Sequence, residues 1–489
     1  MPFHDDTLNF DVVIIGAGIS GICFAHRLQE RNSNLSYCIL EQRSEIGGTW
    51  SLFQYPGIRS DSDLHTFGFP WRPWTEKEAI AQGGAIKRYM QGTVADEGID
   101  DNIKFNRSVR EMDWDSKSKT WSIETVVSGE TVETLQCRFV LLATGYYDYD
   151  QPLEAAIPGI KNFAGDVIHP QFWPKDLDYA GKDVVIIGSG ATAITLLPNL
   201  AKSAKHTTML QRSPSYVLAV PGEDGFDKFA RRWMPAWIAS KIIRMKWILL
   251  PTAFRAYCLA FPTAARKMMS KMTQAQIGED QKLDPNFTPT YNPFEQRMCL
   301  CPNGDFYESL RNGSGSIKTG HIQHVTADSI QLDSGEELRP DIIVTATGLK
   351  LRLGGGVDIS VDGKPYAIPD HYAWKGTMLE GLPNLAFSFG YFDASWTLGV
   401  DSSAKMACRL LKQMDADGVS AIVPSRGEED RRKMKDVSFM PLTSTYVQKG
   451  LRALPKVGDR AQWRPRQTYL WEIFSIKFGD IRTGLDWIQ

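Results

Sequence analysis

Two glycine-rich turns have the spacing that binds a dinucleotide. In the first, Gly16, Gly18 and Gly21 follow the apolar run DVVII in the pattern GxGxxG. Such glycines allow a tight turn and a close approach of the backbone to a pyrophosphate, whose charge is favoured by the free N–H groups of the following helix. Glu41, at the end of the strand-like YCILE, is placed to bind ribose hydroxyls. The strand, the glycine turn, the helix and Glu41 together predict a dinucleotide site.

A second turn repeats the pattern as GxGxxA, with Gly188, Gly190 and Ala193 after another DVVII. At the position where the first unit has an acid, this one has Arg212. A guanidinium binds a 2′-phosphate, and a charged hydrogen bond contributes about 1.5–3 kcal/mol, so the sequence favours NADPH over NADH. The alternative is that Arg212 is an ordinary solvated arginine.

Two longer motifs accompany the turns. The run FAGDVIHPQFWP is too polar for a core strand and too rich in proline and glycine for a helix. It fits FxGxxxHxxxWP at Phe163, Gly165, His169, Trp173 and Pro174. The run GTWSLFQYPGIRSD fits GxWxxxxYPGxxxD, and within it we single out Gly48, Thr49, Trp50 and Asp61. On these motifs the whole chain resembles the type I Baeyer–Villiger monooxygenases. Within that family it resembles the ethionamide-activating branch, through the runs YNPFEQRMCLCPNGDFYESL, ADSIQLDSGEELRPDIIVTATGLK and LPNLAFSFGYFDASWTL.

The resemblance implies an activity and its cofactors. FAD would bind at the first turn and NADPH at the second. The enzyme would insert one oxygen atom of O₂ next to a ketone carbonyl, through a C4a-peroxyflavin, to give an ester or lactone, and would also oxidise sulfides. The alternative is a flavin-containing monooxygenase that oxidises sulfur or nitrogen atoms. That related family lacks the Trp-Pro ending of the fingerprint.

The resemblance also implies a catalytic pair. Arg297 matches the family's active-site arginine, and Asp61 matches the carboxylate that positions it. One positive charge about 4 Å from a negatively charged oxygen contributes about 4 kcal/mol at an effective dielectric near 20, and arginine keeps that charge at any ordinary pH. The alternative is an ordinary ion pair at a domain interface. His169 would belong to the linker that couples the two nucleotide domains. The chain departs from its relatives at Gln296, where relatives outside this branch have a basic residue.

The elements that position these residues predict an α/β protein with two Rossmann-like domains. Each glycine turn lies between an apolar strand and a helix, and two further strands end in ATG, the second with Thr347 and Gly348. We expect an FAD domain in two parts, 1–150 and 349–489. Between them we expect an NADPH domain over 151–348, with a helical insertion at about 223–290.

The insertion has an unusual charge. Residues 228–271 hold ten Lys and Arg and no acid, in a chain whose net charge is −2. With three tryptophans among aliphatic residues, this segment could lie on a membrane surface, but its uncharged runs are shorter than the roughly 18 residues that a spanning helix needs. The alternative is an insertion packed on its own domain, with a basic face that steers NADPH.

The amino-acid composition restricts which other classes of protein the chain could belong to. Apolar residues at 43% and charged residues at 23% are typical of a globular enzyme. The start of the chain has no pattern of a secretion signal, and the seven cysteines form no disulfide framework, so we expect a reducing, cytoplasmic location, with peripheral membrane contact as an option. Cys299 with Cys301 and His321 with His324 lack the further ligands of a metal site, so we expect no metal. Neither a disulfide reductase nor a nucleic-acid-binding protein is favoured. A non-catalytic nucleotide-binding regulator would rest on the basic segment alone.

Overall fold

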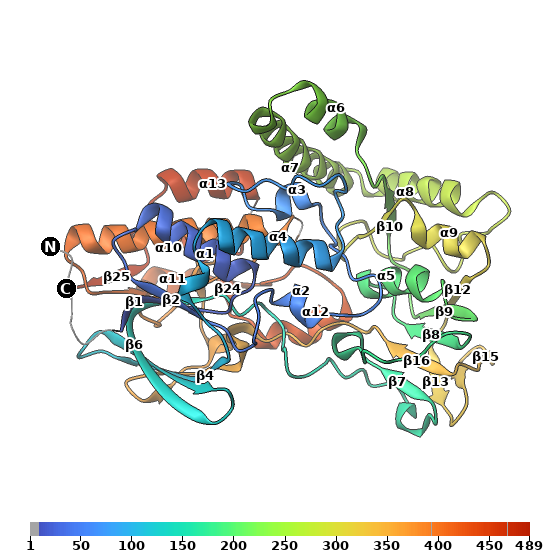
Figure 1. Cartoon of the computed structure of the whole chain (residues 1–489), viewed down its shortest axis with the longest axis horizontal. Coiled ribbons are helices and arrows are strands. Elements are labelled where there is room, and N and C mark those ends of the chain that lie inside the picture. Colours follow the sequence, from blue (N-terminus) through green and yellow to red (C-terminus); the bar gives the residue numbers. More distant parts are fainter. Residues whose placement is uncertain (1–8, 393, 467) are drawn as a thin grey trace.

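The computed structural model describes residues 9–392, 394–466 and 468–489. Two sheets with parallel cores lie side by side, each with helices packed against it (Figure 1). The α/β fold with two Rossmann-like units is therefore confirmed. The chain leaves the first sheet after residue 142, forms the second sheet, and returns to the first at residue 358.

The first sheet is built around a buried parallel core. Its strands are β1 (Phe10–Ile15), β2 (Tyr37–Leu40), β3 (Ile103–Lys104), β4 (Arg107–Asp115), β5 (Thr120–Val127), β6 (Thr131–Leu142), β17 (Asp358–Val361), β18 (Lys364–Pro365), β19 (Ala373–Trp374), β20 (Met378–Leu379) and β21 (Leu385–Phe387). Strand β1 pairs in parallel with β2 and β6, while β4, β5 and β6 form an antiparallel meander. All four residues of β2 are buried, as expected for a strand covered on both faces.

Helices cover this sheet. They are α1 (Ile19–Arg31), α2 (Thr49–Leu52), α3 (Leu64–Phe67), α4 (Gly83–Asp96) and α10 (Trp396–Asp417). Helices α1 and α10 pack together, and the buried ion pair between Arg27 Nε and Asp401 Oδ1, at 2.7 Å, joins them. The core of the first unit is thus made by residues from both ends of the chain.

The second sheet is parallel throughout, in the order β12-β9-β8-β16-β7. Its strands are β7 (Asp166–Ile168), β8 (Asp183–Ile187), β9 (His206–Gln211), β12 (Gly315–Thr319) and β16 (Ile342–Thr345). Helices α5 (Ala191–Leu200) and α9 (Asp305–Arg311) pack on one face; β13 (Ile322–Val325), β14 (Ile330–Leu332) and β15 (Glu337–Leu338) contribute to the core on the other. A separate parallel pair, β10 (Val217–Val220) and β11 (Cys299–Pro302), flanks the insertion.

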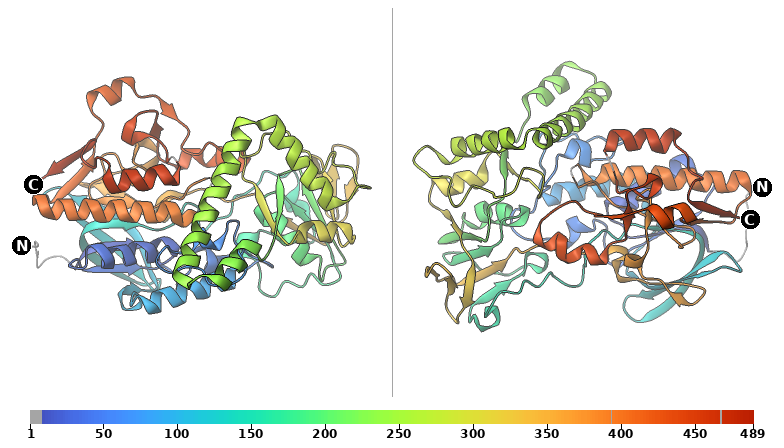
Figure 2. Two further views of the ribbon diagram at one scale, coloured as in Figure 1. Left: turned by 90° about the horizontal axis from the view of Figure 1, so that it is seen from above. Right: turned by 180° about the vertical axis from the view of Figure 1, so that it is seen from behind.

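The insertion is helical. It comprises α6 (Gly225–Trp233), α7 (Ala236–Ala260) and α8 (Pro262–Ile277), and it stands out from one edge of the molecule (Figures 1 and 2). Asp227 fixes α6 to α7 because its carboxylate accepts hydrogen bonds from Lys246 Nζ at 2.5 Å and Trp247 Nε1 at 2.8 Å. Arg244 donates to the carbonyl oxygens of His65 and Gly68, which ties α7 to the first unit.

The C-terminal part completes the first unit. It contains β22 (Ala421–Pro424), β23 (Asp436–Val437), β24 (Val457–Gly458), β25 (Leu485–Ile488), α11 (Glu428–Lys433), α12 (Thr445–Gly450) and α13 (Tyr469–Phe478). Within the described ranges no single helix is long and apolar enough to cross a membrane; only α7 and α8 taken together, bent by 118°, meet that criterion by length and composition.

Candidate active site

A cavity of about 1840 Å³ extends between the two nucleotide units. Its lining includes Gly18 and Gly48 of the first unit, Gly188 and Arg212 of the second, and Arg297. Pockets for a single small molecule usually occupy about 300–1000 Å³. The cavity therefore has the volume for two dinucleotides and a substrate.

The first glycine turn requires its glycines. Gly16 has φ +105°, and a Cβ there would lie 2.8 Å from the carbonyl oxygen of Ala143, in the first ATG. A Cβ on Gly21 would lie 1.9 Å from the carbonyl oxygen of Gly16. Behind the turn, the Glu41 carboxylate accepts hydrogen bonds from the backbone N–H groups of Ala17 at 2.7 Å and Arg43 at 2.9 Å. Burial raises the pKa of Glu41 in spite of these bonds. Its predicted contact with a ribose stays a prediction.

The second turn has the same relation to the second ATG. Gly188 has φ +142°, and a Cβ there would lie 2.3 Å from the carbonyl oxygen of Ala346. Gly190 is the N-cap of α5, and Ala193 in the first turn of that helix is buried. Arg212 directly follows β9 and lines the cavity, where its Nη2 donates to Thr445 Oγ1 at 2.7 Å. The guanidinium predicted to bind a 2′-phosphate thus lies at the same end of the sheet as the turn.

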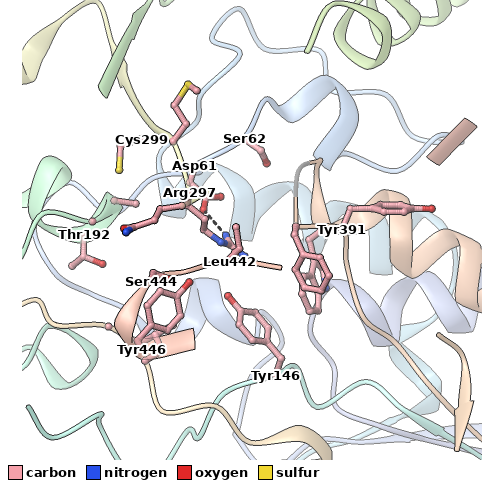
Figure 3. A pocket seen from close by; sticks show the side chains of 18 of the residues that line it. Asp61, Ser62, Tyr146, Thr192, Arg297, Cys299, Tyr391, Leu442, Ser444 and Tyr446 are labelled. Atoms are coloured by element: carbon pink, nitrogen blue, oxygen red, sulfur yellow. Dashed lines mark hydrogen bonds and ion pairs between the residues drawn. The ribbon is translucent and has the colours of Figure 1, made fainter. Parts of the chain in front are cut away.

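Arg297 and Asp61 meet in the middle of the cavity. Arg297 Nη1 donates to Asp61 Oδ2 at 3.2 Å, and Figure 3 shows both side chains between the two units. Arg297 precedes β11, whose Cys299 is buried against the second unit. Asp61 belongs to the loop between α2 and α3. Asp61 of the GxWxxxxYPGxxxD motif and Arg297, which the family resemblance suggested, therefore lie together in space.

The surroundings keep Arg297 charged. Burial alone would lower its pKa, but Tyr446, Tyr146 and Asp61 outweigh that effect and raise the pKa. Its Nε is buried without a hydrogen-bond partner in the described chain, although 34% of the side chain is exposed, toward the cavity. Burial raises the pKa of Tyr146 to about 12, so this phenol stays protonated. Arg297 is therefore a fixed cation whose Nε–H is free to donate a hydrogen bond to a bound group.

The fingerprint lies outside the cavity lining. Residues 166–168 form β7 at the edge of the second sheet, and Pro170–Phe172 form one turn of 3₁₀ helix. Phe163 is buried in the core, and a Cβ on Gly165 would lie 2.4 Å from the carbonyl oxygen of Asp341. Trp173 packs edge to face on Tyr179 and is followed by Pro174. The polar, proline-rich composition is accommodated because an edge strand is covered less than a central one.

His169 links the fingerprint to the second ATG segment. Its Nδ1 accepts from the backbone N–H of Gln171 at 3.2 Å, and the ring lies against the backbone of Gly348. Gln171 Nε2 in turn donates to the carbonyl oxygen of Asp148 at 2.7 Å. Burial lowers the pKa of His169, so the ring is neutral at pH 7. This position fits a structural connection between the units and gives His169 no contact with the cavity.

The remaining predicted cofactor residues line the cavity. A Cβ on Gly48 would lie 3.1 Å from the Cα of Gly18, so the two backbones are close together. Thr49 Oγ1 and the Tyr147 hydroxyl are 2.7 Å apart, and Trp50 packs edge to face on Phe67. In the second ATG, Thr347 has a buried hydroxyl that lacks a partner in the described ranges.

Three residues of the site were missed by the motifs. Tyr146 and Tyr446 lie beside Arg297 in Figure 3, and Thr445 contacts Arg212. The small Gly348 allows Tyr446 to approach, since a Cβ there would lie 2.7 Å from the Cβ of Tyr446. The only sequence signal for Tyr146 is its place directly after the first ATG.

The residues present fit FAD and NADPH. Two glycine turns, one in each unit, face the same cavity as Arg212 and Arg297, and a Cβ on Gly16, Gly21 or Gly188 would overlap backbone atoms. The partnerless Thr347 hydroxyl and Arg297 Nε add donors that a bound group would satisfy. No group of three or more His, Cys, Asp or Glu side chains is placed to hold a metal ion among the residues that the structure describes. Cys23 and Cys38 are both buried free thiols.

Comparisons with known proteins agree with this arrangement. Residues 13–218 match the family model described as pyridine nucleotide-disulphide oxidoreductase. The chain is 45% identical over 476 residues, 97% of its length and 96% of the relative, to the FAD-containing monooxygenase EthA of Mycobacterium tuberculosis. It is 41% identical to the probable FAD-binding monooxygenase AlmA of an Acinetobacter species, over 96% of this chain and 95% of the relative.

A solved structure has the same fold. Cyclohexanone monooxygenase from Rhodococcus sp. Phi1, bound to NADP⁺, superposes with a TM-score of 0.72 at 19% identity, covering 98% of this chain and 99% of that one. With 45% identity to EthA across almost its full length, the chain belongs to the family of FAD-containing monooxygenases.

Proposed function

We propose that the protein is an FAD- and NADPH-dependent Baeyer–Villiger monooxygenase. Overall, a ketone, O₂, NADPH and a proton give an ester or lactone, NADP⁺ and water. The observation that carries the proposal is the Arg297–Asp61 pair, set in a cavity that both glycine turns line. The Baeyer–Villiger motifs around Asp61 and His169 support the same reaction.

The binding roles follow from the two cradles. Gly16, Gly18 and Gly21 would receive the FAD pyrophosphate, and Gly188 and Gly190 that of NADPH, with Arg212 on the 2′-phosphate. When bound, NADPH supplies two electrons and the flavin activates O₂ for transfer. Gly48, Thr49 and Trp50 would complete the flavin pocket, and Thr347 and Gly348 would lie beside the nicotinamide cofactor.

Arg297 would stabilise negative charge at oxygen. Its guanidinium cannot lose its proton at working pH and carries several N–H donors in one plane, so it can contact two oxygens at once. Asp61, 3.2 Å away, fixes the direction of that plane. The charge is present before the reaction begins, so no reorganisation is needed when negative charge develops.

Tyr146 would assist as a neutral donor. Its raised pKa keeps the hydroxyl protonated, so it can donate a hydrogen bond but cannot remove a proton. Its ring stacks on Trp396 with centroids 4.9 Å apart. Aromatic rings at this point exclude water from the oxygen that Arg297 holds, which favours transfer to the substrate over loss as H₂O₂.

Oxidation of sulfides is a second activity of the same site, and oxidation of sulfur or nitrogen alone is the alternative function. Both need the same cofactors, so product analysis must separate them. We also propose contact with a membrane surface through residues 228–271.

The test is a product screen with purified holoenzyme. Linear, cyclic and aryl ketones are compared with thioethers, while NADPH consumption and H₂O₂ are followed together. Ester or lactone in proportion to NADPH consumed supports the proposal. Sulfoxide with no ester from any ketone would assign the protein to heteroatom oxidation.

A further inference from the structure

Exposed apolar side chains gather on the insertion and on α13. Of the 22 large hydrophobic side chains that are exposed in the described residues, 17 lie on these helices or at their joints. Twelve belong to the insertion: Phe226, Phe229, Trp233, Trp237, Ile242, Met245, Leu249, Leu250, Tyr257, Leu259, Phe261 and Met272. Five belong to α13: Leu470, Trp471, Ile473, Phe474 and Phe478. Such a concentration marks a surface that binds something.

These helices occupy one edge of the molecule. Helix α13 lies beside the insertion at the top of Figure 1, and the view from above in Figure 2 agrees. The side chains of Tyr469, at the start of α13, and Arg244, on α7, are hydrogen-bonded to each other. We call α6, α7, α8 and α13 together the helical face.

The helical face carries exposed positive charge that has no carboxylate partner among the described residues. Lys228, Arg232, Lys241, Lys267 and Lys271 are exposed, and residues 228–271 contain no acid. Lys241 lies 5.3 Å from the ring centroid of Trp237, and Lys477 on α13 lies 5.1 Å from that of Phe478. Carboxylates on the same helices are already paired: Asp227 with Lys246, and Glu472 with Arg466 at 2.8 Å.

The cavity reaches this face. Leu250 and Leu259 on α7 line the cavity and are also among the exposed apolar residues of the helical face, at 61% and 52% exposed. Tyr469 of α13 also lines the cavity. The cavity and the helical face therefore share apolar side chains.

We infer that the helical face binds an anionic lipid surface and that the active site takes its substrate from the bilayer. Exposed tryptophans and phenylalanines next to lysines are the composition of a surface that lies at the level of lipid headgroups. The substrate class is then an apolar, long-chain ketone dissolved in the membrane, which enters past Leu250 and Leu259. This substrate class rests on the proposed function; the lipid contact does not.

A second copy of the chain is the competing occupant. Two helical faces in a symmetric dimer would bring the unpaired lysines of one copy against those of the other, and no acid in 228–271 would compensate them. Anionic headgroups would neutralise the same lysines, and each lysine near the membrane surface would contribute to binding. The charge of the helical face thus favours an anionic lipid surface over a second copy of the chain.

The test of the surface uses flotation of the FAD-loaded enzyme. With phosphatidylglycerol vesicles the protein should float, and with phosphatidylcholine vesicles at most weakly. The double variant Trp237→Ser, Trp471→Ser should bind the anionic vesicles at least about ten-fold more weakly, because it removes one exposed aromatic from each half of the face. Neither residue lines the cavity. The matched control is Val132→Ser, 56% exposed on β6 and outside the helical face.

The possible outcomes separate the claims. Failure to float with anionic vesicles, or an equal effect of Val132→Ser, overturns the lipid surface. A dimer in sedimentation that the double variant dissolves assigns the face to a second copy and also overturns it. For the substrate class, a long-chain ketone carried in vesicles should be oxidised more slowly by the double variant, while a short water-soluble ketone is oxidised at the parent's rate. If neither enzyme converts the soluble ketone, the proposed function fails, whatever the flotation result.

Discussion

Replacing Arg212 by Ala tests how the second unit selects its nucleotide. In the structure the guanidinium follows β9, lines the cavity and has one neutral partner, Thr445, at 2.7 Å. A bound NADPH would replace that partner with a charged phosphate. NADH has no group at this position, so the side chain distinguishes between the two nucleotides only through the 2′-phosphate.

The magnitude follows from the exchange of one partner for the other. A hydrogen bond to a charged group contributes about 1.5–3 kcal/mol, and the bond to Thr445 that is given up contributes about 0.5–1.5 kcal/mol. The difference is about 1–2 kcal/mol, which corresponds to about a 5- to 30-fold preference. Arg212→Ala should therefore reduce the ratio of kcat/KM for NADPH to that for NADH by about this factor.

The assay is flavin reduction under anaerobic conditions, which measures hydride transfer without the oxygen chemistry. The matched control is Thr445→Val, which removes the partner and leaves the arginine, so the preference for NADPH should be kept or increased. If Arg212→Ala leaves the NADPH to NADH ratio unchanged, the reasoning on the 2′-phosphate is refuted.

Three further predictions concern the rest of the site. Asp61→Asn should lower the yield of product per NADPH by about 2- to 5-fold, measured by gas chromatography, because an ion pair this exposed contributes at most about 1 kcal/mol; a loss as large as that of removing the arginine would argue against a positioning role. Gly21→Ala should abolish FAD binding, seen as loss of flavin absorbance after gel filtration, because its Cβ would overlap the carbonyl oxygen of Gly16; Gly427→Ala, with open space around it, is the control. Burial acts to raise the pKa of Asp227, but the hydrogen bonds to its carboxylate lower that pKa overall. The ionised carboxylate therefore stabilises the fold fully above about pH 4, and this stabilisation is lost as pH falls through the lowered pKa. Asp227→Asn should lower the free energy of unfolding by about 1.5–3 kcal/mol at pH 7 and by less near pH 3, measured by urea denaturation; an equal loss at both would contradict the linkage.

The local parts of the fold and site could be predicted from the sequence. Each dinucleotide turn consists of a strand, a few glycines and a helix within about 30 residues, so the residue spacing alone is enough to predict it. The family was likewise inferred from two motifs, and the comparisons confirm it. The domain boundaries and the roles of single residues stay predictions.

The contacts between distant segments could not be predicted. Thr445 meets Arg212 across more than 200 residues, and Tyr446 reaches Arg297 only because Gly348 leaves room for it. No spacing rule links such positions, because they are brought together by the packing of the two units. The apolar residues of α13 were missed for a related reason: only the fold places them beside the basic insertion and leaves them exposed.

The role of Arg297 is tested most directly by the fate of oxygen in Arg297→Ala. The variant should still accept hydride from NADPH, yet it should release H₂O₂ in place of ester, because no fixed cation would stabilise negative charge on oxygen beside the substrate. Arg297→Lys, which keeps a charge but loses the planar donors, should give an intermediate yield. Ester formed by Arg297→Ala in the parent's proportion to NADPH consumed would contradict the account.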